Sequence, residues 1–254
     1  MKTKLVLFLF AIISVALLNQ CATGVKSRSL LFRSNEFAIY SVKRDKVKLK
    51  TDSLIPQKLS HPLEITEDKV LDILGNIKYR RESSYGDLNL YVFDDREIKD
   101  FSLDLVDGLQ KLKEDEILLI VSKYNAVKSV VSHYTRTGFY LWATDSSIEL
   151  MFGEIQQEVP YEEQGNYYDW SNISDISFDF SPDVTYVLPG NGYTFKKVTG
   201  FRNRRWLVFN KSELSRLKFE KRKKNSKEIT NSVESDLSPE KRIKKDDEDE
   251  LIND

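Results

Sequence analysis

The strongest constraint on the fold is an amphipathic stretch followed directly by a wholly apolar one. Over residues 98–112, apolar side chains recur at steps of three and four, and charged side chains fill the opposite face. This is the period of a helix packed on a core. Residues 117–121 read ILLIV, without alternation, as in a strand buried on both faces. We therefore predict a helix over 98–112 and a central strand over 117–121 with helices packed over it.

Weaker patterns predict the remaining elements. Thr66 is placed as the N-cap of a second helix that ends near Ile77, with Glu67 and Asp68 in its first turn. Alternation and turn residues predict strands over 37–42, 46–50 and 88–93, a hairpin of 138–143 and 147–155 around the turn 144–146, and short strands over 176–180, 184–188, 193–198 and 206–209. The predicted fold is therefore α+β, with a predominantly antiparallel sheet and two main helices.

The N-terminus has the pattern of a targeting signal. Lys2 and Lys4 precede fourteen residues, 5–18, that carry no charge. A membrane-spanning helix needs about 20 apolar residues, so this run has the length of a signal-peptide core rather than of a permanent span. Asn19 and Gln20 end the run, and the only cysteine of the chain, Cys21, follows at once.

Residues 1–22 resemble the signal of a bacterial lipoprotein, in which a lipobox cysteine is acylated and becomes the mature N-terminus. Leu18 matches the position three residues before that cysteine, whereas Asn19 and Gln20 depart from the small residues usual there, as in the looser lipoboxes of spirochaetes. The resemblance implies lipidation of Cys21 and a place in the cell envelope. Ala22, which is not Asp, favours the outer over the inner membrane by analogy with enteric bacteria. An ordinary secretory signal or an uncleaved anchor is the alternative.

These features divide the chain into four parts. We expect a signal peptide over 1–20, a tether over 21–36, an α+β domain over 37–210, and a charged tail over 211–254. The tail holds 12 basic and 12 acidic residues among 44, with Phe219 as its only aromatic. Such a composition buries too little apolar surface to order a chain, so we expect disorder beyond a first helix over 212–224.

Composition excludes several classes of function. The 39 basic and 40 acidic residues give a net charge of −1, and together with the signal this argues against a nucleic-acid partner. One cysteine and two histidines, His61 and His133, leave little for a zinc site or for a serine–histidine–aspartate triad. We expect no cofactor, no metal site and no catalytic residue.

Two sets of side chains remain as candidates. Aromatic residues gather between 161 and 201, and Tyr167, Tyr168 and Trp170 are the predicted binding residues if these rings are exposed; the alternative is that most of them form a β core. A glycosidase needs only two carboxylates about 5–10 Å apart. The acidic residues that could supply such a pair are Glu149, Glu154, Glu158, Glu162 and Glu163.

Three functions follow from these observations. The leading hypothesis is a lipid-anchored envelope protein that binds a protein or glycan, from the envelope or from a host, without catalysing a reaction. The second is an envelope hydrolase that cleaves glycan or peptidoglycan with paired carboxylates. The third is a structural role in which the charged tail contacts another envelope component.

Overall fold

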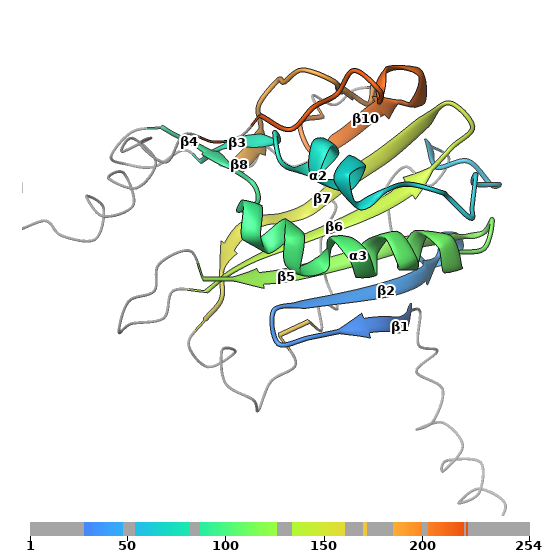
Figure 1. The fold of residues 1–254 in the computed structure, drawn as a ribbon, viewed down its shortest axis with the longest axis horizontal. Coiled ribbons are helices and arrows are strands. Elements are labelled where there is room, and N and C mark those ends of the chain that lie inside the picture. Colours follow the sequence, from blue (N-terminus) through green and yellow to red (C-terminus); the bar gives the residue numbers. More distant parts are fainter. Residues whose placement is uncertain are drawn as a thin grey trace, which may run out of the picture.

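A computed structural model of the chain describes residues 28–47, 54–81, 87–125, 134–160, 170–171, 185–199, 203–220 and 222. These residues form an antiparallel seven-stranded sheet with the strand order β1-β2-β5-β6-β7-β10-β9, and a smaller sheet with the order β4-β3-β8 (Figure 1). The α+β prediction is confirmed.

The large sheet is built mainly from neighbouring antiparallel strands. Its strands are β1 (Arg28–Arg33), β2 (Phe37–Lys43), β5 (Glu116–Tyr124), β6 (Thr135–Ala143), β7 (Ser147–Glu158), β10 (Trp206–Asn210) and β9 (Thr194–Phe195). The predicted hairpin is β6–β7, and its turn is closed by Thr144, whose hydroxyl accepts the Ser147 N–H at 3.1 Å. The small sheet comprises β4 (Leu88–Tyr91), β3 (Lys78–Arg81) and β8 (Thr185–Val187).

Both α-helices lie on the same face of the large sheet (Figure 1). The helix α3 (Asp95–Lys111) begins at a capping box, in which the Asp94 side chain caps the first turn and the Glu97 side chain accepts the Asp94 N–H. The helix α2 (Glu67–Leu74) begins at Thr66, whose hydroxyl accepts the Lys69 N–H, as predicted. It ends three residues before Ile77, which enters the core from the extended link to β3.

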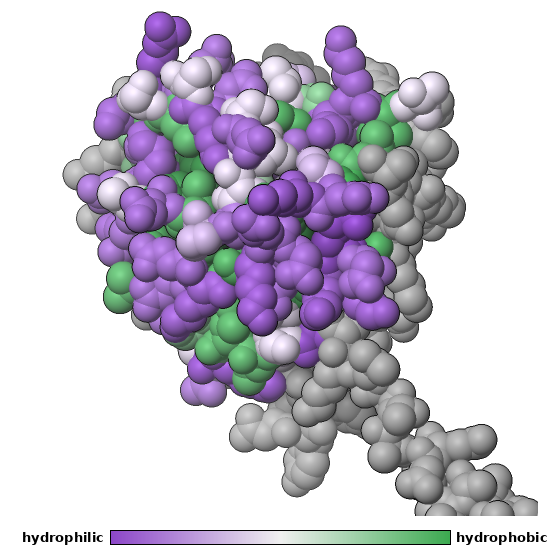
Figure 2. Space-filling model, turned by 90° about the vertical axis from the view of Figure 1, so that its right-hand side faces the viewer, coloured by the Kyte–Doolittle hydropathy of each residue, from purple (hydrophilic) through white to green (hydrophobic). Residues whose placement is uncertain are grey.

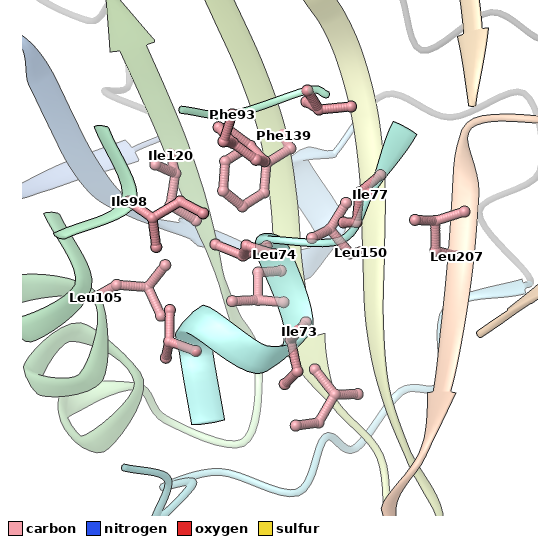
Figure 3. Close-up of a cluster of buried hydrophobic side chains, with 14 of the residues drawn as sticks. Ile73, Leu74, Ile77, Phe93, Ile98, Leu105, Ile120, Phe139, Leu150 and Leu207 are labelled. Carbon is pink, nitrogen blue, oxygen red and sulfur yellow. The ribbon is translucent and has the colours of Figure 1, made fainter. Parts of the chain in front are cut away.

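The main core lies between the helices and the sheet. Figure 3 shows Leu74 of α2 and Ile98 and Leu105 of α3 facing Ile120, Phe139 and Leu150 of the strands. Each of these side chains is at most 1% exposed. The apolar faces that the sequence pattern predicts therefore meet in one layer, and their burial is the main source of stability.

The other face of the sheet is covered differently from the prediction. A second core cluster joins Val121, Trp142 and Trp206 of the strands to Ile55 and Leu59 of the segment before α2, and to Trp170. Among the described residues, irregular segments rather than helices cover this face. The buried strand 117–121 is confirmed, but an apolar run specifies burial on both faces and not the kind of element that provides it.

The folded part begins within the segment expected to be a tether. The strand β1 pairs with β2 and has a register shift between Leu30 and Phe32. That irregularity breaks the period of two, so the sequence of β1 shows no strand pattern. The tether prediction for residues 28–33 is therefore wrong.

The predicted strand over 46–50 is also not found in its described part. Lys46 belongs to the 3₁₀ turn η2 (Arg44–Lys46), whereas residues 48–50 lie outside the described residues, as does the predicted strand 176–180.

The beginning of the charged tail also belongs to the fold. In its described part, the predicted helix over 212–224 is replaced by the 3₁₀ turn η4 (Lys211–Glu213), a further turn and an irregular segment that contacts α2. We call residues 211–220 together with Arg222 the C-terminal strap. Residues 223–254 lie outside the described part. The domain boundary expected at 210 is therefore too early, because the strap is held by tertiary contacts that its composition does not reveal.

Candidate functional site

The aromatic binding surface predicted around Trp170 is not found at that residue. Trp170 is only 6% exposed and packs in the second core cluster. The Lys123 ammonium lies 4.9 Å from its ring centroid, and the Arg136 guanidinium donates to its carbonyl at 3.3 Å. The Trp170 ring is therefore part of the core. This is the alternative in which the aromatic residues of this segment form a β core rather than an exposed binding surface. Tyr167, Tyr168 and the lipidation candidate Cys21 lie outside the described residues.

The described acidic candidates do not form a glycosidase pair. Glu149 accepts hydrogen bonds from Trp206 Nε1 at 2.8 Å and from Lys196 Nζ at 3.0 Å, and Glu154 is held by Arg136 at 2.6 Å. Glu149 and Glu154 are five positions apart along β7, which corresponds to roughly 16 Å, beyond the 5–10 Å that this chemistry requires. Glu158 is exposed at the end of β7, and Glu162 and Glu163 lie outside the described part.

His61 is a structural histidine. It is 6% exposed, and its Nε2 accepts the Ala143 N–H at 3.3 Å, which fixes the proton on Nδ1. Burial, with a smaller effect of the nearby Lys211 charge, lowers the pKa of His61 to about 4. The imidazole is therefore neutral near pH 7 and supports the end of β6. His133 lies outside the described residues.

A buried carboxyl group lies under the N-terminus of α3. Glu97 is 4% exposed and accepts a hydrogen bond from the Ser122 hydroxyl on β5. Burial raises the pKa of Glu97 to about 7, although the Ser122 and Asp94 hydrogen bonds act in the opposite direction. The sequence does not reveal the burial of Glu97, because the local pattern identifies it only as the third residue of a capping box. Its burial comes from the sheet beneath it.

A concave surface lined by several charged and polar side chains lies between the small sheet and the C-terminal strap. Its volume is about 640 Å³, and we call it the strap cleft. It is lined by Asn76 after α2, Lys78 of β3 and Tyr91 of β4. The turn 189–192 with Tyr193 and the strap complete the lining. Segments from three distant parts of the sequence therefore meet here, along the upper part of the molecule in Figure 1.

Side chains of α2 hold the strap by its backbone. Lys69 Nζ donates to the carbonyls of Leu214 and Leu217, and Asp72 Oδ1 accepts the Phe219 N–H at 2.8 Å. Asn76 donates to the Lys218 carbonyl at 2.8 Å and accepts the Glu220 N–H at 3.1 Å. Because these contacts engage backbone groups, they fix the path of the strap without occupying its charged side chains.

Apolar residues of the strap anchor it from below. Leu217 is 8% exposed and lies against Gly192, where a Cβ atom would approach its Cδ1 to 2.5 Å. Gly192 also has a φ of +90°, a backbone conformation that side chains disfavour. Phe219 lies over Gly75 in the same way, since a Cβ there would come within 2.4 Å of its ring. Both glycines therefore allow the strap to approach closely.

Arg222 holds the C-terminal end of the strap. Its guanidinium lies 3.0 Å from the Asp95 carboxylate, donates to the Gly75 carbonyl at 2.7 Å and stacks 3.8 Å from the centroid of the Tyr91 ring. The strap thereby joins α2, α3 and the small sheet. The basic run 221–224 is visible in the sequence, but the structural role of Arg222 within it is not.

The charges that line the strap cleft are not neutralised within the described part of the molecule. Lys78, Arg216 and Lys218 provide three positive charges, and Glu213 and Glu220 provide two negative ones. None of the five makes an ion pair with another described residue, and the Lys78 ammonium makes only a cation–π contact of 5.0 Å with Tyr91. Within the described part, these five side chains are therefore not engaged in ion pairs.

Other surface charges are paired. Figure 2 shows a face of the molecule that hydrophilic residues dominate, with hydrophobic residues scattered among them. Near the end of α3, Lys58 lies 3.2 Å from Glu114, and Lys43 lies 3.8 Å from Asp115. The charges of the strap cleft differ from this self-paired surface, because no described residue pairs with them.

Over the described ranges, no group of three histidine, cysteine or acidic side chains is arranged to hold a metal ion. No helix within those ranges is long and apolar enough to cross a membrane. Comparison of the chain with family models, with curated proteins and with solved structures gave no match.

Proposed function

We propose that the protein is a lipid-anchored component of the cell envelope that binds a partner through the strap cleft without catalysing a reaction. The lipobox-like signal supports the anchor, and the open charges of the cleft support the binding role. The observation that carries the proposal is the separation between the N-terminal strand and the cleft.

This separation follows from the strand order. The first described residue, Arg28, starts β1 at one edge of the large sheet, and β9, which follows the floor of the cleft, forms the other edge. With neighbouring strands about 4.8 Å apart, the six intervals between these edges span roughly 29 Å. The seven intervals from Cys21 to Arg28 extend at most about 25 Å. An acylated Cys21 would hold β1 near the bilayer and leave the strap cleft on the distant side.

Acylation of Cys21 is tested by mass spectrometry of the protein from its native membrane, beside a Cys21→Ala variant. We expect a mature chain that begins at an acylated Cys21 and is absent from the variant. Acyl chains contribute about 0.8 kcal/mol per buried CH₂, so the variant should leave the membrane fraction if it is processed, or stay unprocessed. An unmodified chain that is cut elsewhere would refute the anchor.

The binding role is tested separately by crosslinking in intact membranes. A photoreactive side chain in place of Arg216 should give a discrete crosslinked product, and the same group in place of Lys58, on the self-paired surface, should not. Equal products from both positions would contradict a role for the cleft.

The hydrolase remains the second candidate, because Glu162 and Glu163 lie outside the described residues. Its test is the release of soluble fragments from purified peptidoglycan. We expect none. Release that is lost in an E162Q or E163Q variant would establish the hydrolase and refute the non-enzymatic proposal.

A further inference from the structure

The order of charges along the strap suggests what the cleft binds. From the N-terminal to the C-terminal end of the strap, the cleft-lining charges are Glu213, Arg216, Lys218 and Glu220, so two cations lie between two anions. All four side chains are exposed. A ligand that complements the strap carries the reverse order, in which two anions lie between two cations.

The local structure keeps these charges on the cleft side. Burial alternates along residues 217–220: Leu217 is buried and Phe219 is half-buried, whereas Lys218 and Glu220 are exposed. Leu217 and Phe219 pack against the glycines beneath, whereas Lys218 and Glu220 line the cleft. The backbone contacts with Lys69, Asp72 and Asn76 fix this register.

The small sheet adds to the same selectivity. Lys78 brings a third cation, so the cleft carries one net positive charge, and along the strap sequence the two basic residues lie between the two acidic ones. Opposite charges that line one cleft without pairing leave both signs available to a ligand. A purely anionic ligand would meet Glu213 and Glu220, and a purely cationic one would meet the three basic residues.

We infer that the strap cleft binds a peptide segment of a partner protein in which two acidic side chains are flanked by basic ones. This inference rests on the proposed binding role and specifies its ligand. A peptide segment fits because it can present acidic and basic side chains in a fixed order, as the strap does with Glu213, Arg216, Lys218 and Glu220. The volume of about 640 Å³ lies within the range of sites for ligands of this size.

Two peptides of identical composition provide the test. Peptide KGDGDGK, with acetylated and amidated ends, has the complementary order of charges, and peptide DGKGKGD has the reverse order. Binding to the full chain in nanodiscs is measured by titration calorimetry at low and at high salt. One exposed ion pair changes affinity by at most about fivefold, so two or three pairs should favour KGDGDGK by about tenfold at low salt. High salt should abolish most of this preference.

A charge-swap variant tests whether the strap recognises the order of charges in the ligand. The double variant K218E/E220K keeps the composition and changes only exposed side chains, so it should fold and lose the preference for KGDGDGK. The matched control K43E/D115K also exchanges one exposed basic and one exposed acidic residue, far from the cleft, and should keep the preference.

Three outcomes would overturn the inference. The peptides could bind with equal affinity, the preference could survive in K218E/E220K, or neither peptide could bind at low salt. If neither binds while crosslinking at position 216 still gives its product, only the ligand class is wrong. If crosslinking also fails, the binding role itself is refuted.

Discussion

The variant Glu97→Gln provides a quantitative test of the buried carboxyl group under α3. The pKa of Glu97 is raised from 4.5 to about 7 in the folded protein, mainly by burial. The folded state therefore holds this proton more tightly than the unfolded state does. The stabilisation is complete below pH 4.5 and is lost as the pH rises through 7. At 1.36 kcal/mol per pKa unit, the loss amounts to about 3 kcal/mol.

Glutamine preserves the local structure but does not titrate. Its amide can accept the Asp94 N–H as the capping box requires, and its NH₂ can donate to the Ser122 hydroxyl. We expect the variant to match the wild type near pH 4.5 and to exceed its free energy of unfolding by about 3 kcal/mol at pH 8. Urea unfolding followed by fluorescence measures this difference, because Trp142 and Trp206 are fully buried reporters. A difference that stays constant from pH 4.5 to 8 would refute a raised pKa for Glu97.

Two further predictions concern the buried histidine, His61, and the strap. His61→Gln can retain an acceptor for the Ala143 N–H. Because the pKa of His61 is lowered from 6.5 to about 4, its titration costs the wild type about 3 kcal/mol as the pH falls from 6.5 to 4, whereas the opposite contribution of Glu97 is shared by both proteins. The free energy of unfolding of the variant, relative to that of the wild type, should therefore rise by about 3 kcal/mol over this range in urea unfolding. Equal acid sensitivity of the two proteins would contradict the lowered pKa. A chain that ends after Lys224 keeps every described strap contact and should melt within about 2 °C of the full chain in calorimetry. A chain that ends after Arg216 loses the packing of Leu217 and Phe219 and should be less stable by about 4 kcal/mol. Equal melting of the two truncated chains would show that the strap is not part of the fold.

Much of the scaffold was predictable because its determinants are local. The positions of Phe101 and Leu105 in a period of 3.6, the cap at Thr66 and the turn at Thr144 each depend on residues within a few positions of one another. The apolar run 117–121 likewise specifies a buried strand. The structure confirms these elements and extends several of them by one to three residues.

The errors arose where tertiary contacts override local pattern. The strand β1 has no alternation because of its register shift, yet pairing with β2 orders it. The strap has the composition of a solvated tail, yet the backbone contacts from α2 and the contacts of Arg222 hold it. In hindsight, the alternation of Leu217, Lys218, Phe219 and Glu220 is the one local signal that could have indicated a half-buried segment.

The sequence by itself determined the α+β class, the helix α3, the central strand β5 and the lipobox-like signal, because each depends on periodicity or on neighbouring residues. Only the tertiary structure decided that Trp170 is buried and that Lys78 and Lys218 line one cleft. The physical reason is distance along the chain. A local pattern states which side of an element is buried, whereas a site is formed by residues that the topology brings together from segments more than 100 positions apart.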